Sequence, residues 1–190
     1  MERAGFELVG GRRIAYARHD AQGDPRAIVV MAHGFKSSKI GPSRYFVALA
    51  RTLAARGVST FRFDQPGSGD SEGDFDNSSF VTWTRTIEHF VRAFDDAGLR
   101  VALLGQSMGG TAAMAATAAL AGRLRGVALW SPGPMLDRSE QLDADTWVEE
   151  DGQRVRGAFW REAEAVDFLH CLQRLDAPAY MVFGTADHLI

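Results

Sequence analysis

The sequence lacks a cysteine pair, a long hydrophobic run, a strong net charge and a cluster of metal ligands. Its single cysteine, Cys171, excludes an intramolecular disulfide and fits a reducing compartment, so we expect a cytoplasmic protein. No segment suits a signal peptide or a membrane span, and a net charge of −3 gives no electrostatic attraction to nucleic acid or anionic membrane. No group of His, Cys and Asp residues has ligand spacing. We therefore expect no metal, no organic cofactor, no nucleic-acid partner and no membrane partner.

The chain alternates short apolar segments with longer amphipathic ones. No repeat or linker divides the 190 residues, so we assign residues 1–190 to one domain. Apolar strands that alternate with helices predict an α/β fold, with a mostly parallel sheet and helices on both faces. Ligands bind such sheets at the carboxyl ends of the strands. Strands are expected at about 5–9, 12–18, 26–34, 58–64, 100–105, 126–132 and 177–184, and helices at about 45–57, 81–98, 110–122 and 160–175.

The segment GQSMGG, residues 105–110, joins an expected strand to an Ala-rich helix and fits the pattern G-x-S-x-G. A serine on such a sharp turn projects its hydroxyl clear of the sheet, and the following helix places the positive end of its dipole there. The pattern therefore predicts that Ser107 is a nucleophile. The alternatives are a glycine-rich turn that merely begins a helix and a phosphate-binding loop, which the absence of a lysine after the glycines disfavours.

Two backbone N–H groups are candidates for an oxyanion hole. Acyl transfer forms a tetrahedral oxyanion that needs preorganised hydrogen-bond donors. One candidate is the N–H of Met108, after the nucleophile, and the other is the N–H of Phe35, in the segment HGF that ends an earlier strand. The turn FDQPGSGDS, residues 63–71, is interpreted as structural because its glycines allow positive φ and its polar side chains can bond local backbone. A direct catalytic role for Asp64 or Asp70 is the alternative.

Three motifs, HGFKSS, RFDQPGSGDSEGDF and GQSMGG, resemble in this order the α/β-hydrolase superfamily. They are particularly similar to its branch of feruloyl/cinnamoyl esterases and serine-aminopeptidase-like (S33-type) hydrolases, and the likeness runs from about Phe6 to Asp187. The resemblance implies a triad in the order nucleophile, acid, histidine. It implies that Ser107 is the nucleophile and that Asp187, in the segment GTAD, is the acid. It does not imply a particular substrate.

An insert at about 132–159 interrupts the alternation of strands and helices. Its Asp151-Gly152 pair is a strong hairpin signal. An insert at this position would overhang the carboxyl ends of the strands as a short lid, which the resembled branch also carries after its sixth strand. An ordinary surface loop is the alternative. Four residues are expected to line an apolar pocket for the acyl or alcohol group: Met135, Leu136, Trp147 and Trp160.

The histidine of the implied triad has no obvious place in this sequence. The resembled branch supplies it from a later segment, whereas the sequence ends three residues after Asp187. The other histidines fall on early strands, within helices or in the oxyanion segment, and His188 adjoins the acid and is at best a makeshift base. We therefore expect the last strand, the last helix and the triad histidine to be absent. Loss of a triad member lowers the rate by about 10⁴- to 10⁶-fold, so activity should be impaired.

Without a further strand, residues 179–183 would form an unpaired apolar edge. Three explanations compete: a truncated or frameshifted chain, a naturally short chain whose edge is covered by homo-oligomerisation, and a binding module. We favour the first, because lid, oxyanion segment, nucleophile and acid are all retained.

Two functional hypotheses follow. The first is a serine hydrolase of small carboxylic esters, including aryl or cinnamoyl esters, that works through an acyl-enzyme and is impaired in this chain. The second is a non-catalytic pseudo-hydrolase that binds a ligand or supports an assembly on the same scaffold.

Overall fold

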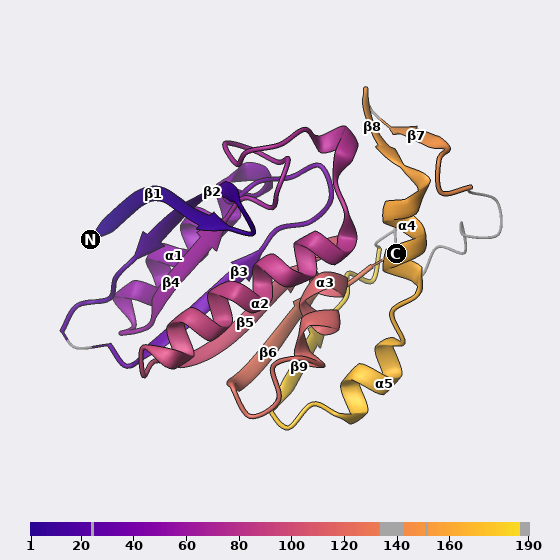
Figure 1. Cartoon of the computed structure of the whole chain (residues 1–190). Coiled ribbons are helices and arrows are strands. Elements are labelled where there is room, and N and C mark those ends of the chain that lie inside the picture. Colours follow the sequence, from indigo (N-terminus) through magenta and orange to yellow (C-terminus); the bar gives the residue numbers. More distant parts are fainter. Residues whose placement is uncertain (24, 134–142, 151, 187–190) are drawn as a thin grey trace.

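The computed structural model describes residues 1–23, 25–133, 143–150 and 152–186. Seven strands form its main sheet: β1 (Glu2–Val9), β2 (Arg12–His19), β3 (Ala27–Ala32), β4 (Ser59–Phe63), β5 (Arg100–Gln106), β6 (Leu124–Trp130) and β9 (Ala179–Val182). Their order across the sheet is β1-β2-β4-β3-β5-β6-β9 (Figure 1). β1 pairs with β2, and β2 with β4, in antiparallel fashion, and the other pairs are parallel. The predicted mostly parallel α/β sheet is confirmed.

Helices cover both faces of this sheet (Figure 1). They are α1 (Tyr45–Ala55), α2 (Phe80–Asp96), α3 (Met108–Thr117), α4 (Gly157–Glu164) and α5 (Phe168–Gln173). α1 packs on one face, and α2 and α3 pack on the other, where α4 lies against α2 and α5 against α3. Within the described part of the chain, no helix has both the length and the apolar character needed to cross a membrane.

Side chains along β3 alternate between two buried clusters. Val30 joins the main core on the side of α2 and α3, whereas its neighbour Met31 packs with Phe46 of α1. This alternation explains why the strand reads as a continuous apolar run, because both of its faces are covered by helices.

The single helix predicted at 160–175 is two helices in the structure. α4 ends at Glu164 and α5 begins at Phe168. Asp167 marks the break, because its carboxylate accepts a 2.8 Å hydrogen bond from the backbone N–H of His170 and so caps a new helix.

The insert after β6 contains the predicted hairpin. β7 (Trp147–Glu150) and β8 (Gln153–Arg156) pair in antiparallel fashion, and the turn residue Asp151 lies outside the described residues. Val155 is fully buried in the main core, and Val148, its pairing partner in the hairpin, packs against the same core. The hairpin projects beyond α4 at one end of the molecule (Figure 1).

Candidate active site

Ser107 occupies the sharp turn between β5 and α3. Its backbone φ of 52° and ψ of −130° are values that residues other than glycine rarely adopt, so this turn stores strain. The N–H of Ser107 donates to the carbonyl of Trp130 over 2.9 Å, and its own carbonyl accepts from the N–H of Gly110 over 2.7 Å. The side chain is half-buried at the carboxyl end of β5. The predicted strand–turn–helix position of Ser107 is therefore present.

The glycines around Ser107 are required by close backbone packing. A β-carbon on Gly105 would lie 2.5 Å from the carbonyl oxygen of Gly109. A β-carbon on Gly109 would overlap the carbonyl oxygen of His33 and lie 2.6 Å from that of Ala32. Both glycines thus allow the start of α3 to approach β5 and the end of β3. We call residues 105–110 the nucleophile elbow.

The segment after β3, residues 33–40, which we call the oxyanion loop after its predicted role, packs directly on the elbow. The N–H of Gly34 donates to the side-chain carbonyl of Gln106 over 3.2 Å. A β-carbon on Gly34 would lie only 3.0 Å from the β-carbon of Ser107. Phe35 is the next residue of this loop. The N–H groups of Phe35 and Met108 donate to no described residue, and their role as oxyanion donors stays a prediction.

His33 is a structural residue of the oxyanion loop. Its ring is fully buried, and its Nε2 accepts a 2.9 Å hydrogen bond from the N–H of Gln65. The proton must then lie on Nδ1, which donates to the carbonyl of Gly34 over 2.8 Å. Burial lowers the pKa of His33, and the hydrogen bond to Gly34 and the charge of Asp64 offset this effect only in part. With both nitrogens engaged, His33 cannot act as the base for Ser107.

Asp64 and Lys39 fasten the oxyanion loop to the turn after β4. Asp64 is fully buried and accepts hydrogen bonds of 2.6 Å from both the backbone N–H and the Nζ of Lys39. The N–H of Asp70 donates to the same carboxylate over 2.9 Å, and Nζ of Lys39 also contacts Asp70. Burial works against the charge of Lys39, but the hydrogen bonds to Asp64 and Asp70 raise its pKa. These contacts support the structural interpretation of the two aspartates.

Phe35 links the oxyanion loop to the elements that cover it. Its ring lies 5.0 Å from that of Phe75, 5.5 Å from that of Phe159 and 4.8 Å from that of Trp160. Phe159 and Trp160, both on α4, are buried, and Phe75 begins a short 3-10 turn. The aromatic packing therefore holds Phe35 in place from the side of the insert.

The four predicted pocket residues have different outcomes. Met135 and Leu136 lie outside the described residues. Trp160 is buried, and its ring packs on that of Phe35 in the oxyanion loop. Trp147 is on the face of the hairpin opposite the core-packing valines, where its ring lies 4.7 Å from the guanidinium of Arg154 and 4.8 Å from that of Arg156. A pocket role for these residues stays a prediction.

The predicted acid, Asp187, and its neighbour His188 also lie outside the described residues. β9 runs parallel to β6, so it ends at the same edge of the sheet as β5. The N–H of Ser131 donates to the carbonyl of Val182 over 2.7 Å, which fixes the end of β9 at that edge. This direction is compatible with an acid after β9, and the role of Asp187 stays a prediction.

None of the described histidines is hydrogen-bonded to Ser107. His19 lies on β2, 3.5 Å from Glu2, and His89 lies in the second half of α2. His170 is exposed on α5. Together with the engaged His33, these positions agree with the expectation that none of these side chains completes the triad.

Two residues of the site were missed by sequence reasoning. Gln106 was treated only as the variable position of the motif, yet its side chain holds the oxyanion loop. Lys39 was not singled out, although it neutralises the buried Asp64. The sequence did contain one signal, because Asp64 directly follows a strand of the buried type. An isolated buried carboxylate is costly, so a cation was to be expected near it.

Residues 23–165, well over half of the chain, match the family described as "Serine aminopeptidase, S33". The chain belongs to this S33 family of α/β hydrolases. The resemblance expected from the three motifs is confirmed. The region that matches the S33 family contains the oxyanion loop, the nucleophile elbow and the hairpin of the insert, while β9 and Asp187 follow it.

Two curated relatives of this S33 chain are similar to it in sequence, and both are lipases. A monoacylglycerol lipase from Mycolicibacterium smegmatis is 34% identical over 131 residues, which is 67% of this chain and 45% of that protein. A monoglyceride lipase from Homo sapiens is 34% identical over 113 residues, 58% of this chain and 36% of that protein. The chain therefore spans less than half the length of either relative.

Solved structures show the same fold. Est1E from Butyrivibrio proteoclasticus, with ferulic acid bound, superposes with a TM-score of 0.88 at 22% identity, over 98% of this chain and 81% of that chain. The mouse alpha/beta hydrolase domain-containing protein 10 superposes with a TM-score of 0.74 at 20% identity, over 99% of this chain and 80% of that chain.

Proposed function

We propose that the chain is a serine hydrolase of small carboxylic esters that works through an acyl-enzyme. The observation that supports this proposal most is the position of Ser107, which sits at a φ of 52° on an elbow pressed against the oxyanion loop. A strained serine at the carboxyl edge of a parallel sheet, with two unengaged N–H groups as candidate oxyanion donors, supports a nucleophile of acyl transfer.

In the proposed mechanism, Oγ of Ser107 attacks the ester carbonyl carbon and forms a tetrahedral intermediate. The negative oxygen accepts hydrogen bonds from the N–H groups of Phe35 and Met108. The intermediate collapses, the alcohol leaves with a proton, and water hydrolyses the acyl-serine ester. Asp187 is proposed as the acid that orients a histidine base, and α4 with the β7–β8 hairpin as the lid that shapes the pocket.

The proposed substrates are small esters with an apolar acyl or alcohol group. The two curated relatives are named as lipases of monoacylglycerols, and the structural relative Est1E was solved with ferulic acid. These names support two test series, monoacylglycerols and aryl or cinnamoyl esters. We also propose a cytoplasmic location, which the single cysteine supports.

We propose that residues 1–190 on their own turn over slowly. A serine hydroxyl is a weak nucleophile until a base takes its proton, and no described histidine is hydrogen-bonded to Ser107. Removal of a triad member leaves about 10³- to 10⁴-fold catalysis over water, supplied by the oxyanion hole and binding. This same observation favours the second candidate, a ligand-binding protein on the hydrolase scaffold.

A fluorophosphonate probe separates the two candidates. The purified chain is incubated with the probe, digested, and the modified peptide is located by mass spectrometry. The hydrolase proposal expects modification at Ser107 and none in the Ser107→Ala variant. Ser131→Ala is a matched control, because Ser131 is also a partly exposed serine with positive φ, 41°, at a strand end. A folded protein that stays unmodified at Ser107 would favour the ligand-binding protein.

A further inference from the structure

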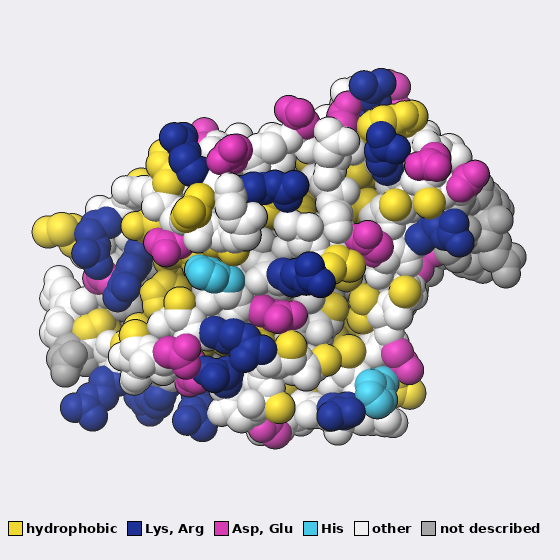
Figure 2. Space-filling model, viewed as in Figure 1, with side chains coloured by type: hydrophobic (Ala, Val, Ile, Leu, Met, Phe, Trp, Pro, Cys, Tyr) yellow, Lys and Arg dark blue, Asp and Glu magenta, His cyan; other side chains and the backbone are white. Residues whose placement is uncertain are grey.

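A cavity apart from Ser107 lies on the side of the sheet that α2 covers, between β1, β2 and β4 and the second half of α2. Its volume is about 370 Å³, within the range of small-molecule sites. Figure 2 shows hydrophobic side chains exposed between basic side chains and a histidine on the face that β1 and α2 share. The cavity contains no residue of the nucleophile elbow or the oxyanion loop.

The register between β1 and β2 places the residues that line one wall of this cavity. Arg3 of β1 pairs with Arg18 of β2, and Gly5 pairs with Tyr16 one row further along the same face. Gly5 has no side chain, and the ring of Tyr16 lies over it. A β-carbon on Gly5 would be only 2.9 Å from the Tyr16 hydroxyl oxygen. The Tyr16 ring therefore occupies the space that a side chain at residue 5 would take, and it forms a wall of the cavity between Arg3 and Glu7.

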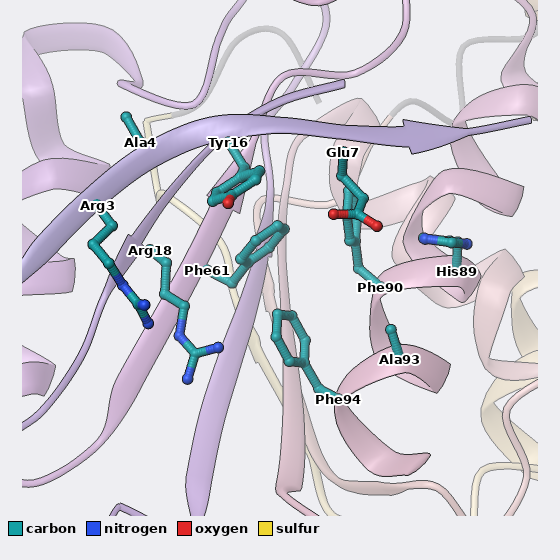
Figure 3. Close-up of a pocket in the computed structure, with 10 residues that line it drawn as sticks. All are labelled: Arg3, Ala4, Glu7, Tyr16, Arg18, Phe61, His89, Phe90, Ala93 and Phe94. Carbon is teal, nitrogen blue, oxygen red and sulfur yellow. The ribbon is translucent and has the colours of Figure 1, made fainter. Parts of the chain in front are cut away.

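The floor of the cavity is aromatic. The ring of Tyr16 stacks on that of Phe61, with centroids 5.0 Å apart, and Phe61 lies 4.9 Å from Phe94 of α2. Figure 3 shows these rings between the two arginines at one end and Glu7 with His89 at the other. A flat apolar group of one ring would find stacking partners here.

The arginine end is built to accept an anion. Asp20 orients both guanidinium groups, with Nη2 of Arg3 at 2.7 Å and Nε of Arg18 at 2.6 Å. One carboxylate between two guanidinium groups leaves a net positive charge at this end. The side chain of Arg18 is only 29% exposed, its guanidinium lies 5.6 Å from the ring of Phe94, and its terminal nitrogens donate to no described residue. A planar guanidinium held in this way matches a carboxylate.

The other end is suited to a hydrogen-bond donor. Glu7 of β1 and His89 of α2 both line the cavity there. Arg3 and Glu7 are four residues apart on one strand, which separates them by about 13 Å along the sheet. One aromatic ring with a short acid-bearing arm spans such a distance.

We propose that this cavity is a binding site for an aromatic carboxylate with a hydroxyl group on the far side of its ring. The carboxylate binds the terminal nitrogens of Arg18 and Arg3, the ring lies against Tyr16, Phe61 and Phe94, and the hydroxyl donates to Glu7. The site is separate from Ser107, and its existence does not depend on the proposed hydrolase function.

Isothermal titration calorimetry with 3-(4-hydroxyphenyl)propionate tests the proposal on the full chain. We expect saturable binding that is unchanged in Ser107→Ala. Arg18→Met should weaken binding about tenfold or more, since it removes charged hydrogen bonds to the ligand. Gly5→Val should weaken it by displacing the Tyr16 ring, on which the ligand's ring is proposed to lie. Arg12→Met is the matched control, because Arg12 is an exposed arginine of the same strand that does not line the cavity, and it should bind as the parent does.

The ligand series needs no variant and covers the case in which Arg18→Met does not fold. The carboxamide of the same ligand should bind the unmodified chain about tenfold more weakly or worse, and 3-phenylpropionate, which lacks the hydroxyl, should bind more weakly as well. Equal binding of acid and carboxamide, loss of binding in Ser107→Ala, unchanged binding in both Arg18→Met and Gly5→Val, or no binding at millimolar acid would each overturn the proposal.

Discussion

Replacing Gly109 by alanine should separate the nucleophile elbow from the oxyanion loop. The added β-carbon would lie 2.6 Å from the carbonyl oxygen of Ala32 and closer still to that of His33. Ordinary carbon–oxygen contacts are about 3.3 Å or longer, so the start of α3 or the end of β3 has to move. Both obstacles are backbone atoms, which cannot rotate away. Overpacking of a core costs about 1–3 kcal/mol, and we expect Gly109→Ala near the upper end of that range.

Urea unfolding at one pH measures this effect. A loss of about 3 kcal/mol corresponds to a decrease of about 6–12 °C in the thermal midpoint for a chain of this size. The same variant should react more slowly with a fluorophosphonate, since the N–H of Met108 moves relative to that of Phe35. Gly126→Ala is the matched control, because its β-carbon would meet nothing closer than 3.6 Å. If Gly109→Ala unfolds within about 0.5 kcal/mol of the parent, as a surface substitution does, the packing argument is wrong.

Three further predictions follow from the loop contacts and the sheet edge. Burial holds the pKa of His33 below its ordinary value of 6.5, so below pH 6.5 the unfolded chain binds a proton that the folded chain does not. The free energy of unfolding should therefore be intact above pH 6.5 and fall below it by up to about 1.4 kcal/mol per pH unit. In urea titrations between pH 7 and 5, His33→Gln should flatten this slope, and an equal slope in the variant would refute the prediction. Lys39→Met leaves the buried carboxylate of Asp64 without its cation and should cost about 3–5 kcal/mol, whereas Asp70→Asn, at an exposed position, should cost about 1 kcal/mol or less in the same unfolding assay. β9 is an edge strand of the described sheet, and Val182 is 57% exposed, so the chain should self-associate through 179–183. Val182→Lys should shift it toward monomer in size-exclusion chromatography with light scattering, and a parent that is already monomeric would refute this prediction.

The sheet and the elbow were predictable because local patterns specify them. Apolar runs that end in glycine-rich turns located β3, β4 and β5, and the G-x-S-x-G pattern placed Ser107 at a strand-to-helix turn. The glycine positions are a steric requirement of that turn, so the motif carries its own structural explanation. Asp151-Gly152 located the hairpin for the same reason, since the turn demands those residue types.

What sequence reasoning missed depends on contacts between distant segments. The break at Asp167 was hidden by a helical pattern that continues through it, and only the cap bond to His170 reveals it. The roles of Gln106 and Lys39 arise where three strand ends meet, which no local pattern encodes. The cavity between β1, β2, β4 and α2 likewise depends on register, because the Tyr16 ring can lie over residue 5 only when a glycine is paired opposite to it.

A crystal structure of the chain with phenylboronic acid bound tests the central claim most directly. Boron takes the place of the carbonyl carbon, and a bond to Oγ of Ser107 makes it tetrahedral. Our account predicts that bond, with one boronate oxygen about 2.7–3.1 Å from the backbone nitrogens of Phe35 and Met108. A boronate bound elsewhere, or bonded to Ser107 with its oxygens turned away from both nitrogens, would contradict it.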